Sequence, residues 1–224
     1  MTKYTVEMIN LSHLFHLLDS KTLIVPSFQR KFSWEQNHVL DLMESIKNGY
    51  PIGMITVLQG APEYFEETTE DSSLLPNYQS RDGLSYDKLW IVDGLQRIST
   101  LYNTLHIKNN EFPVAYDFSL NKFVYSNEEN TNQIRLSSLF SSKEFIRFQR
   151  ESLQRDEAEI LIEKANDLHD AFRNYQFPIQ KFHNMNTDDV LNVFQSLNSR
   201  GVALNSEDLK NAMNYKTNKK INKD

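Results

Sequence analysis

A chain of 224 residues, 39% of them hydrophobic and 12% aromatic, can bury a full core, and we expect one soluble α+β domain. Its formal net charge of −6 argues against a protein that coats nucleic acid without sequence preference. The lack of cysteine excludes disulfides and cysteine-ligated zinc, and no membrane span or signal peptide is recognisable, so we expect the protein in the cytoplasm.

The first predicted elements are a helix over about residues 12–18 and a short strand over 23–25. The stretch SFQRKFSW follows and combines a glutamine and two cations with aromatic side chains. Ser33 and Gln36 have the spacing of a capping box, which predicts the start of a second helix. Gly49 is the natural end of that helix.

Residues 52–58 are predicted to form the next strand. From 59 to 86 the hydrophobic periodicity is lost and acidic residues gather, which favours an exposed, loosely packed insertion. We expect that this insertion lies near the functional site and that its deletion leaves the fold intact.

The stretch WIVDGLQRIST, at residues 90–100, is the centre of the prediction. Its first three residues form a buried strand, Asp93 and Gly94 form the turn that ends it, and a helix opens around Arg97. A strand that runs through a glycine into a helix directs backbone N–H groups and the helix dipole at whatever lies above the turn. This arrangement predicts an anion site.

Two side chains at the start of this helix suit a phosphate. Gln96 and Arg97 supply an amide and a guanidinium that could hold phosphate oxygens, while Asp93 could orient the arginine or hold a nucleotide's magnesium ion. The alternative is an ordinary turn and a capped helix with a surface arginine. These residues alone leave both interpretations open.

The second half of the chain is predicted to begin with a hairpin of strands 112–118 and 122–125. Residues 141–175 have a helical composition, and a strand over 177–182 follows. Thr187 is expected to cap a further helix that ends at 198–201.

Three motifs in this order, VPSFQRKFSW, LWIVDGLQRISTL and FQSLNSRGVALNSEDLK, resemble the N-terminal domain of the GmrSD-type, modification-dependent restriction enzymes, over about residues 8–212. The resemblance implies a ParB- and sulfiredoxin-like small mixed sheet flanked by helices. We therefore expect a nucleotide-binding core at 1–135 that carries the insertion at 59–86, a helical extension of the same domain at 136–215 and a flexible tail at 216–224.

Family members are taken to bind or hydrolyse nucleoside triphosphates, with Mg²⁺, in defence against phage DNA. The residues that match the family's motifs by position, together with Ser99 in the same helix, are Gln29, Arg30, Asp93, Gly94, Gln96, Arg97, Asn198 and Gly201. Among these, the resemblance gives catalytic roles to Asp93, Gln96 and Arg97. Leu95 departs from the usual DGQQR signature, so we expect nucleotide binding with at most weak turnover.

Members commonly continue into an HNH nuclease domain, which this sequence lacks, so we expect no nuclease activity from this chain alone. The six histidines are scattered and predict no metal site. The expected function is a nucleoside-triphosphate-binding regulatory domain of a restriction system, with a nuclease domain or subunit as partner and DNA reached through that partner. The alternatives are a non-catalytic DNA- or protein-binding module and an inhibitory remnant of such a system.

Overall fold

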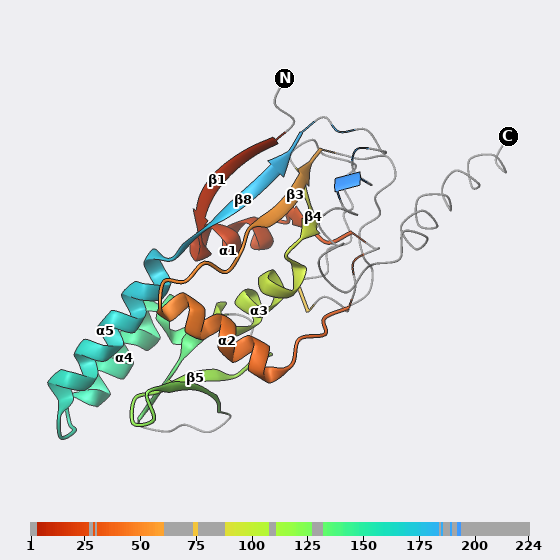
Figure 1. Cartoon of the computed structure of the whole chain (residues 1–224). Coiled ribbons are helices and arrows are strands. Elements are labelled where there is room, and N and C mark those ends of the chain that lie inside the picture. Colours follow the sequence, from red (N-terminus) through yellow and green to blue (C-terminus); the bar gives the residue numbers. More distant parts are fainter. Residues whose placement is uncertain are drawn as a thin grey trace, which may run out of the picture.

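In the described part of the chain, two β-sheets and the helices packed against them make up the fold (Figure 1). The computed structural model describes residues 4–26, 29, 31–60, 74–75, 88–107, 111–126, 132–183, 185, 189 and 192–193. A mixed five-stranded sheet and a small antiparallel sheet confirm the expected α+β class.

The main sheet has the strand order β1-β8-β3-β4-β2. Its strands are β1 (Tyr4–Asn10), β8 (Gln176–Phe182), β3 (Ile55–Gln59), β4 (Leu89–Asp93) and β2 (Leu23–Ile24). Strand β4 runs parallel to β2 and antiparallel to β3, and β3 runs parallel to β8. The strand before the glycine turn thus lies directly beside the short strand at 23–24.

Strand β1 at the edge of this sheet was not predicted from the sequence. It pairs antiparallel with β8, but five of its seven residues are exposed. Tyr4, Val6 and Met8 alternate with polar residues at the period of a strand, and all three apolar side chains are about half exposed.

The small sheet contains the predicted hairpin. Strands β5 (Val114–Asp117) and β6 (Lys122–Tyr125) pair antiparallel, and β7 (Gln133–Arg135) adds to the other edge of β5. A 3₁₀ helix, η2 (Leu136–Phe140), follows directly.

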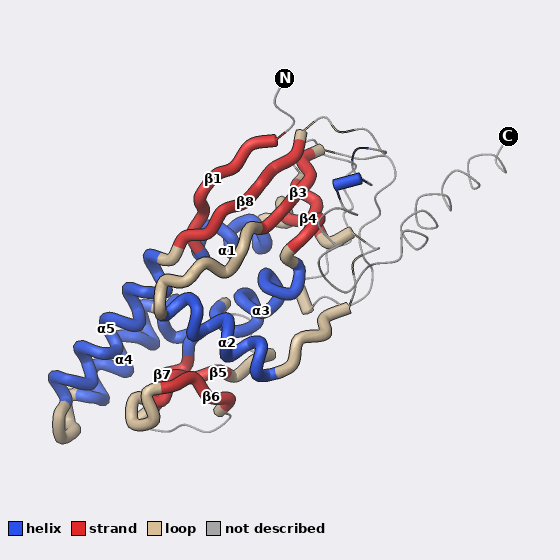
Figure 2. The backbone as a smooth tube through the Cα atoms, viewed as in Figure 1, coloured by secondary structure: helices blue, strands red, loops and turns tan. Residues whose placement is uncertain are grey.

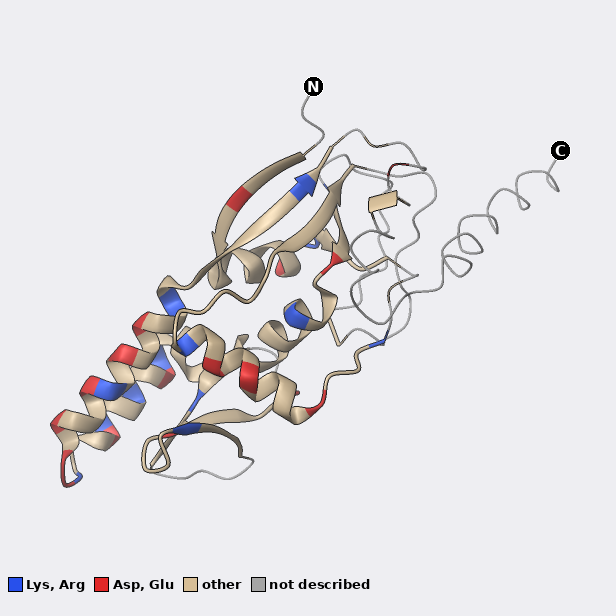
Figure 3. Cartoon of the chain, in the orientation of Figure 1, with Lys and Arg blue, Asp and Glu red and all other residues tan. Residues whose placement is uncertain are grey.

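The α-helices fill the space between and beside the sheets (Figure 2). They are α1 (Leu11–Asp19), α2 (Gln36–Lys47), α3 (Leu95–Leu105), α4 (Ser142–Ser152) and α5 (Ala158–Asn174). Helices α4 and α5 run side by side away from the main sheet and carry much of the charge (Figure 3). Within the described residues, no helix is long and apolar enough to cross a membrane.

Helix α2 begins later than its predicted capping box. The N-cap is Glu35, whose backbone N–H donates to His38 Nδ1 at 3.2 Å. The prediction of Ser33 as the cap is wrong, because the Ser33 N–H instead donates to the side chain of Gln96. A long-range contact thus overrides a local signal.

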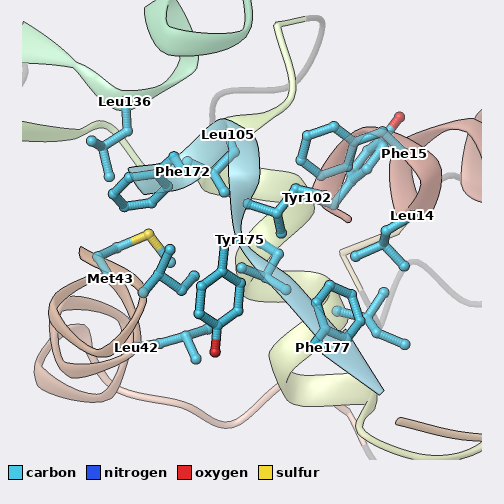
Figure 4. Close-up of a cluster of buried hydrophobic side chains, with 14 of the residues drawn as sticks. Leu14, Phe15, Leu42, Met43, Tyr102, Leu105, Leu136, Phe172, Tyr175 and Phe177 are labelled. Atoms are coloured by element: carbon cyan, nitrogen blue, oxygen red, sulfur yellow. The ribbon is translucent and has the colours of Figure 1, made fainter. Parts of the chain in front are cut away.

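The hydrophobic core lies between the main sheet and the helices (Figure 4). Strand β8 contributes Phe177 and Ile179, and α5 contributes Phe172, all at most 1% exposed. Each large side chain buried in this way contributes about 1.5–3 kcal/mol relative to an exposed one. The chain after residue 135 is therefore more than a helical extension, because β8 lies inside the main sheet.

The predicted insertion at 59–86 is only partly described. Leu75 is 4% exposed and belongs to the core, and the Leu74 carbonyl accepts a hydrogen bond from Asn103 Nδ2 at 2.7 Å. The expectation of a loosely packed surface segment is wrong at these two residues, because the Leu75 side chain packs in the core and the Leu74 carbonyl is hydrogen-bonded to Asn103. The predicted helix from Thr187 to 201 and the tail at 216–224 lie largely or wholly outside the described residues.

Candidate functional site

The turn between β4 and α3 has the geometry that the sequence predicts. Gly94 is the N-cap of α3 with φ +101, and no side chain caps the helix. A Cβ on Gly94 would lie 2.4 Å from Cδ1 of Ile55, so that both the backbone conformation and the close packing require glycine. The start of α3 is thereby held against β3.

The guanidinium of Arg97 is fixed beside this turn. Its Nη2 donates to Asp93 Oδ2 at 2.8 Å, and its Nη1 donates to the Ile52 carbonyl at 2.9 Å. The Arg97 side chain is 18% exposed and that of Asp93 is 38% exposed. Asp93 therefore orients the arginine, which was one of its two predicted roles.

Gly53 packs directly against the arginine. It has φ +86, and a Cβ at this position would lie 2.5 Å from Arg97 Nη1. The loop before β3 thus closes one side of the space that the guanidinium occupies.

The two glutamines of the predicted site bond to the protein backbone. Gln29 Nε2 donates to the carbonyls of Ile91 and Val92, at 2.8 and 3.1 Å. Gln96 accepts from the Ser33 N–H at 2.8 Å, and its amide donates to the Lys31 carbonyl at 3.1 Å. Together they tie the segment 29–33 to the end of β4 and the start of α3.

The remaining predicted residues are placed differently. Arg30, Asn198 and Gly201 lie outside the described residues. Ser99 is fully buried, so its hydroxyl does not reach the solvent-facing side of the turn. Leu95, the departure from the family signature, is 4% exposed and packs in the core. The side chain at this position therefore faces away from any ligand at the turn.

Sequence reasoning missed Tyr175, the residue between α5 and β8. Its hydroxyl donates to the Tyr50 carbonyl at 2.6 Å and accepts from the Ile52 N–H at 3.2 Å. Burial raises the pKa of Tyr175 above its ordinary value, partly offset by the hydrogen bond from Ile52. An aromatic residue in a stretch of helical composition is predicted to pack in the core, and no local sequence signal distinguishes Tyr175 from its neighbours.

No metal-binding cluster of three or more histidine, aspartate or glutamate residues occurs in the part of the chain that the structure describes. His13 and His16, one helical turn apart, are both exposed on α1. The chemistry that the turn offers is that of an anchored cation next to a helix N-terminus, which suits an anion.

Comparison with known proteins agrees with the motifs of the sequence. The family model of the GmrSD restriction endonuclease N-terminal domain matches residues 11–215. An uncharacterized protein of Methanocaldococcus jannaschii is 27% identical over 119 residues, which is 48% of this chain and 19% of the relative. The chain thus covers about a fifth of that relative's length. Because the family model covers nearly the whole sequence, the chain belongs to the GmrSD restriction endonuclease N-terminal domain family.

Proposed function

We propose that the turn from Asp93 to Arg97 binds the phosphates of a nucleoside triphosphate, and that the domain regulates the nuclease activity of its restriction system in response. The observation that carries the proposal is the Arg97 guanidinium, held in place beside a helix N-terminus that no side chain caps. Helix N-termini and guanidinium groups both favour phosphate oxygens.

The fixed arginine lowers the cost of binding. A guanidinium has five N–H donors, and the contacts with Asp93 and Ile52 involve two of its nitrogens. Immobilising a flexible side chain on binding costs about 0.5–1.5 kcal/mol. Arg97 is already immobilised in the unliganded fold, so ligand binding loses little side-chain entropy at this residue.

Arg30 is the second cation of the proposed site, by its match to the family motif. Its neighbours in the sequence, Gln29 and Lys31, are each bonded to the segment 91–96. Mg²⁺ would enter with the triphosphate, since this ion is usually held by phosphates and one or two carboxylates. Asp93 can supply such a carboxylate, although in the unliganded fold it accepts from Arg97.

The contacts favour binding over rapid turnover. Both ends of the Gln96 side chain bond to backbone groups, and the Asp93 carboxylate is paired with Arg97. A general base or a water-positioning group has to be available to the reacting water. Nucleotide occupancy, rather than fast hydrolysis, is therefore the proposed signal to a nuclease partner.

The test is a titration with the four common nucleoside triphosphates, with and without Mg²⁺, on wild type, Arg97→Ala and Arg97→Lys. Alanine should weaken binding by at least about tenfold, since charge-assisted hydrogen bonds are each worth about 1.5–3 kcal/mol. Lysine should restore only part of the affinity, because it keeps the positive charge but lacks the two parallel N–H donors of a guanidinium. Arg147→Ala, which removes a 62% exposed arginine on α4, is the matched control and should bind as wild type does.

The two hydrogen bonds of Arg97 also stabilise the unliganded fold, so the variant differs from wild type in stability as well as in affinity. Arg97→Ala should destabilise the fold by roughly 2–3 kcal/mol, a value reduced by the partial exposure of Asp93. Affinities are therefore measured well below the melting temperature, with circular dichroism as a check on folding. Unchanged affinity of Arg97→Ala for every triphosphate in the presence of Mg²⁺ would refute the phosphate-binding role and favour an interaction module.

A further inference from the structure

Two hydrogen bonds that share Ile52 connect Tyr175, at the end of α5, to Arg97. The Tyr175 hydroxyl joins the Tyr50 carbonyl to the Ile52 N–H, at 2.6 and 3.2 Å. The carbonyl of the same residue, Ile52, accepts from Arg97 Nη1 at 2.9 Å. One residue of the loop before β3 therefore contacts both the tyrosine and the arginine.

Tyr175 restrains a loop in which the Pro51 ring already fixes one backbone torsion and the Ile52 side chain packs against the core. Pro51 has no N–H, so Ile52 carries the first backbone donor after Tyr50. Gly53, the next residue, has φ +86 and imposes little restraint of its own. A hydroxyl that bonds to the carbonyl before the proline and to the N–H after it fixes the peptide between Pro51 and Ile52, which adjoins the peptide that carries the Ile52 carbonyl.

The hydroxyl is needed for this contact and not for packing. Tyr175 is 8% exposed and its ring belongs to the core, where Phe172 and Phe177 flank it in the sequence (Figure 4). A phenylalanine would fill nearly the same volume without the cost of burying a polar group. The tyrosine at this point is explained by its two hydrogen bonds.

We propose that Tyr175 is a positioning residue for Arg97. Through this contact, Tyr175 couples the junction of α5 and β8 to the phosphate site. This inference rests on the proposed function for its consequence, but the positioning of Arg97 is a property of the unliganded protein. Displacement of the junction would move the Ile52 carbonyl and with it the guanidinium. By linkage, a ligand that favours one position of Arg97 would also favour one position of the junction.

The experiment compares wild type with Tyr175→Phe in two measurements. The first is affinity for nucleoside triphosphates with Mg²⁺, which should fall by about three- to tenfold, the range expected for loss of one neutral hydrogen bond. The second is the NMR signal of the Arg97 guanidinium without ligand, assigned through its loss in Arg97→Lys. The Nη protons should exchange faster by rotation in the variant, since the carbonyl that holds Nη1 is less well fixed.

Tyr116→Phe is the matched control. The Tyr116 side chain is also buried, and its hydroxyl donates to Asn121 Oδ1 at 2.6 Å in the small sheet. This variant should lose similar stability while both the affinity and the Arg97 signal stay as in wild type. Equal effects of the two variants would overturn the proposal, because a general loss of stability would then explain them.

A double variant separates action through Arg97 from action on the fold. If Tyr175 works through the arginine, Tyr175→Phe should change affinity by less than about twofold in an Arg97→Ala background. The same loss in both backgrounds would overturn the positioning role and leave the phosphate site standing. Should wild type bind no triphosphate, the proposed function fails, while the Arg97 signal in Tyr175→Phe still supports or overturns the positioning.

Discussion

Replacing Gly53 by alanine tests whether the Arg97 side chain is fixed by its hydrogen bonds or can move aside without loss of stability. The added Cβ would lie 2.5 Å from Arg97 Nη1, which is too close for both to keep their positions. Gly49→Ala is a close control, because Gly49 has φ +68 and nothing lies within 4 Å of its ideal Cβ. Both variants carry a left-handed backbone, but only one displaces the guanidinium.

The expected costs follow from these contacts. A non-glycine residue in the left-handed region costs about 1–2 kcal/mol, which both variants share. Gly53→Ala should lose roughly 1.5 kcal/mol more, because the displaced guanidinium gives up its bond to the Ile52 carbonyl. For a domain of this size, 1 kcal/mol lowers the melting temperature by about 2–4 °C.

Urea unfolding and thermal melts of both variants provide the measurement, and each is repeated in an Arg97→Ala background. With the guanidinium removed, Gly53→Ala should cost no more than Gly49→Ala. Equal losses at the two glycines in the wild-type background would show that Arg97 swings aside freely. The argument that the unliganded fold fixes this side chain would then be wrong.

Two further predictions concern the core and the small sheet. Leu75→Ala should destabilise the fold by about 2–4 kcal/mol in urea unfolding, whereas Leu120→Ala, at a 59% exposed position, should stay within about 0.5 kcal/mol of wild type; equal values would place the Leu75 side chain outside the core. The pKa of Asp117 is held below its usual 3.8, first by the hydrogen bond from Gln133 and then by backbone N–H groups, against the opposing effect of burial. The ionised Asp117 carboxylate therefore stabilises the fold above pH 3.8, and this contribution is lost as the pH falls through the lower pKa of the folded state. The difference in unfolding free energy between wild type and Asp117→Asn should shrink between neutral pH and about pH 3. A gap that does not change with pH would contradict this assignment.

Local patterns in the sequence were sufficient for many elements. The strand, glycine turn and helix at 89–105 formed where the spacing of apolar residues and Gly94 predicted them, because a buried strand and an amphipathic helix each show a characteristic period. The hairpin of β5 and β6 was predicted for a similar reason. The family could also be inferred from the order of three short motifs.

The tertiary structure decided which groups meet. Gln96 hydrogen-bonds to the backbone of residues 31 and 33, more than sixty positions away in the chain, and α2 begins after Glu35 instead of after Ser33. The prediction missed edge strand β1, although apolar and polar residues alternate along it, and it missed the burial of Leu75, which lies in an acidic stretch of the sequence.

The sequence alone determined that Asp93, Gly94 and Arg97 share a turn at the start of a helix, since these residues are neighbours in the chain. It did not determine that the arginine is held from the other side by Ile52, or that Tyr175 fixes that loop. Those contacts join residues 45 and 123 positions apart and depend on hydrogen bonds to backbone groups. Every residue except proline carries the same backbone N–H and C=O groups, so no side-chain pattern reveals such a contact before the chain is folded.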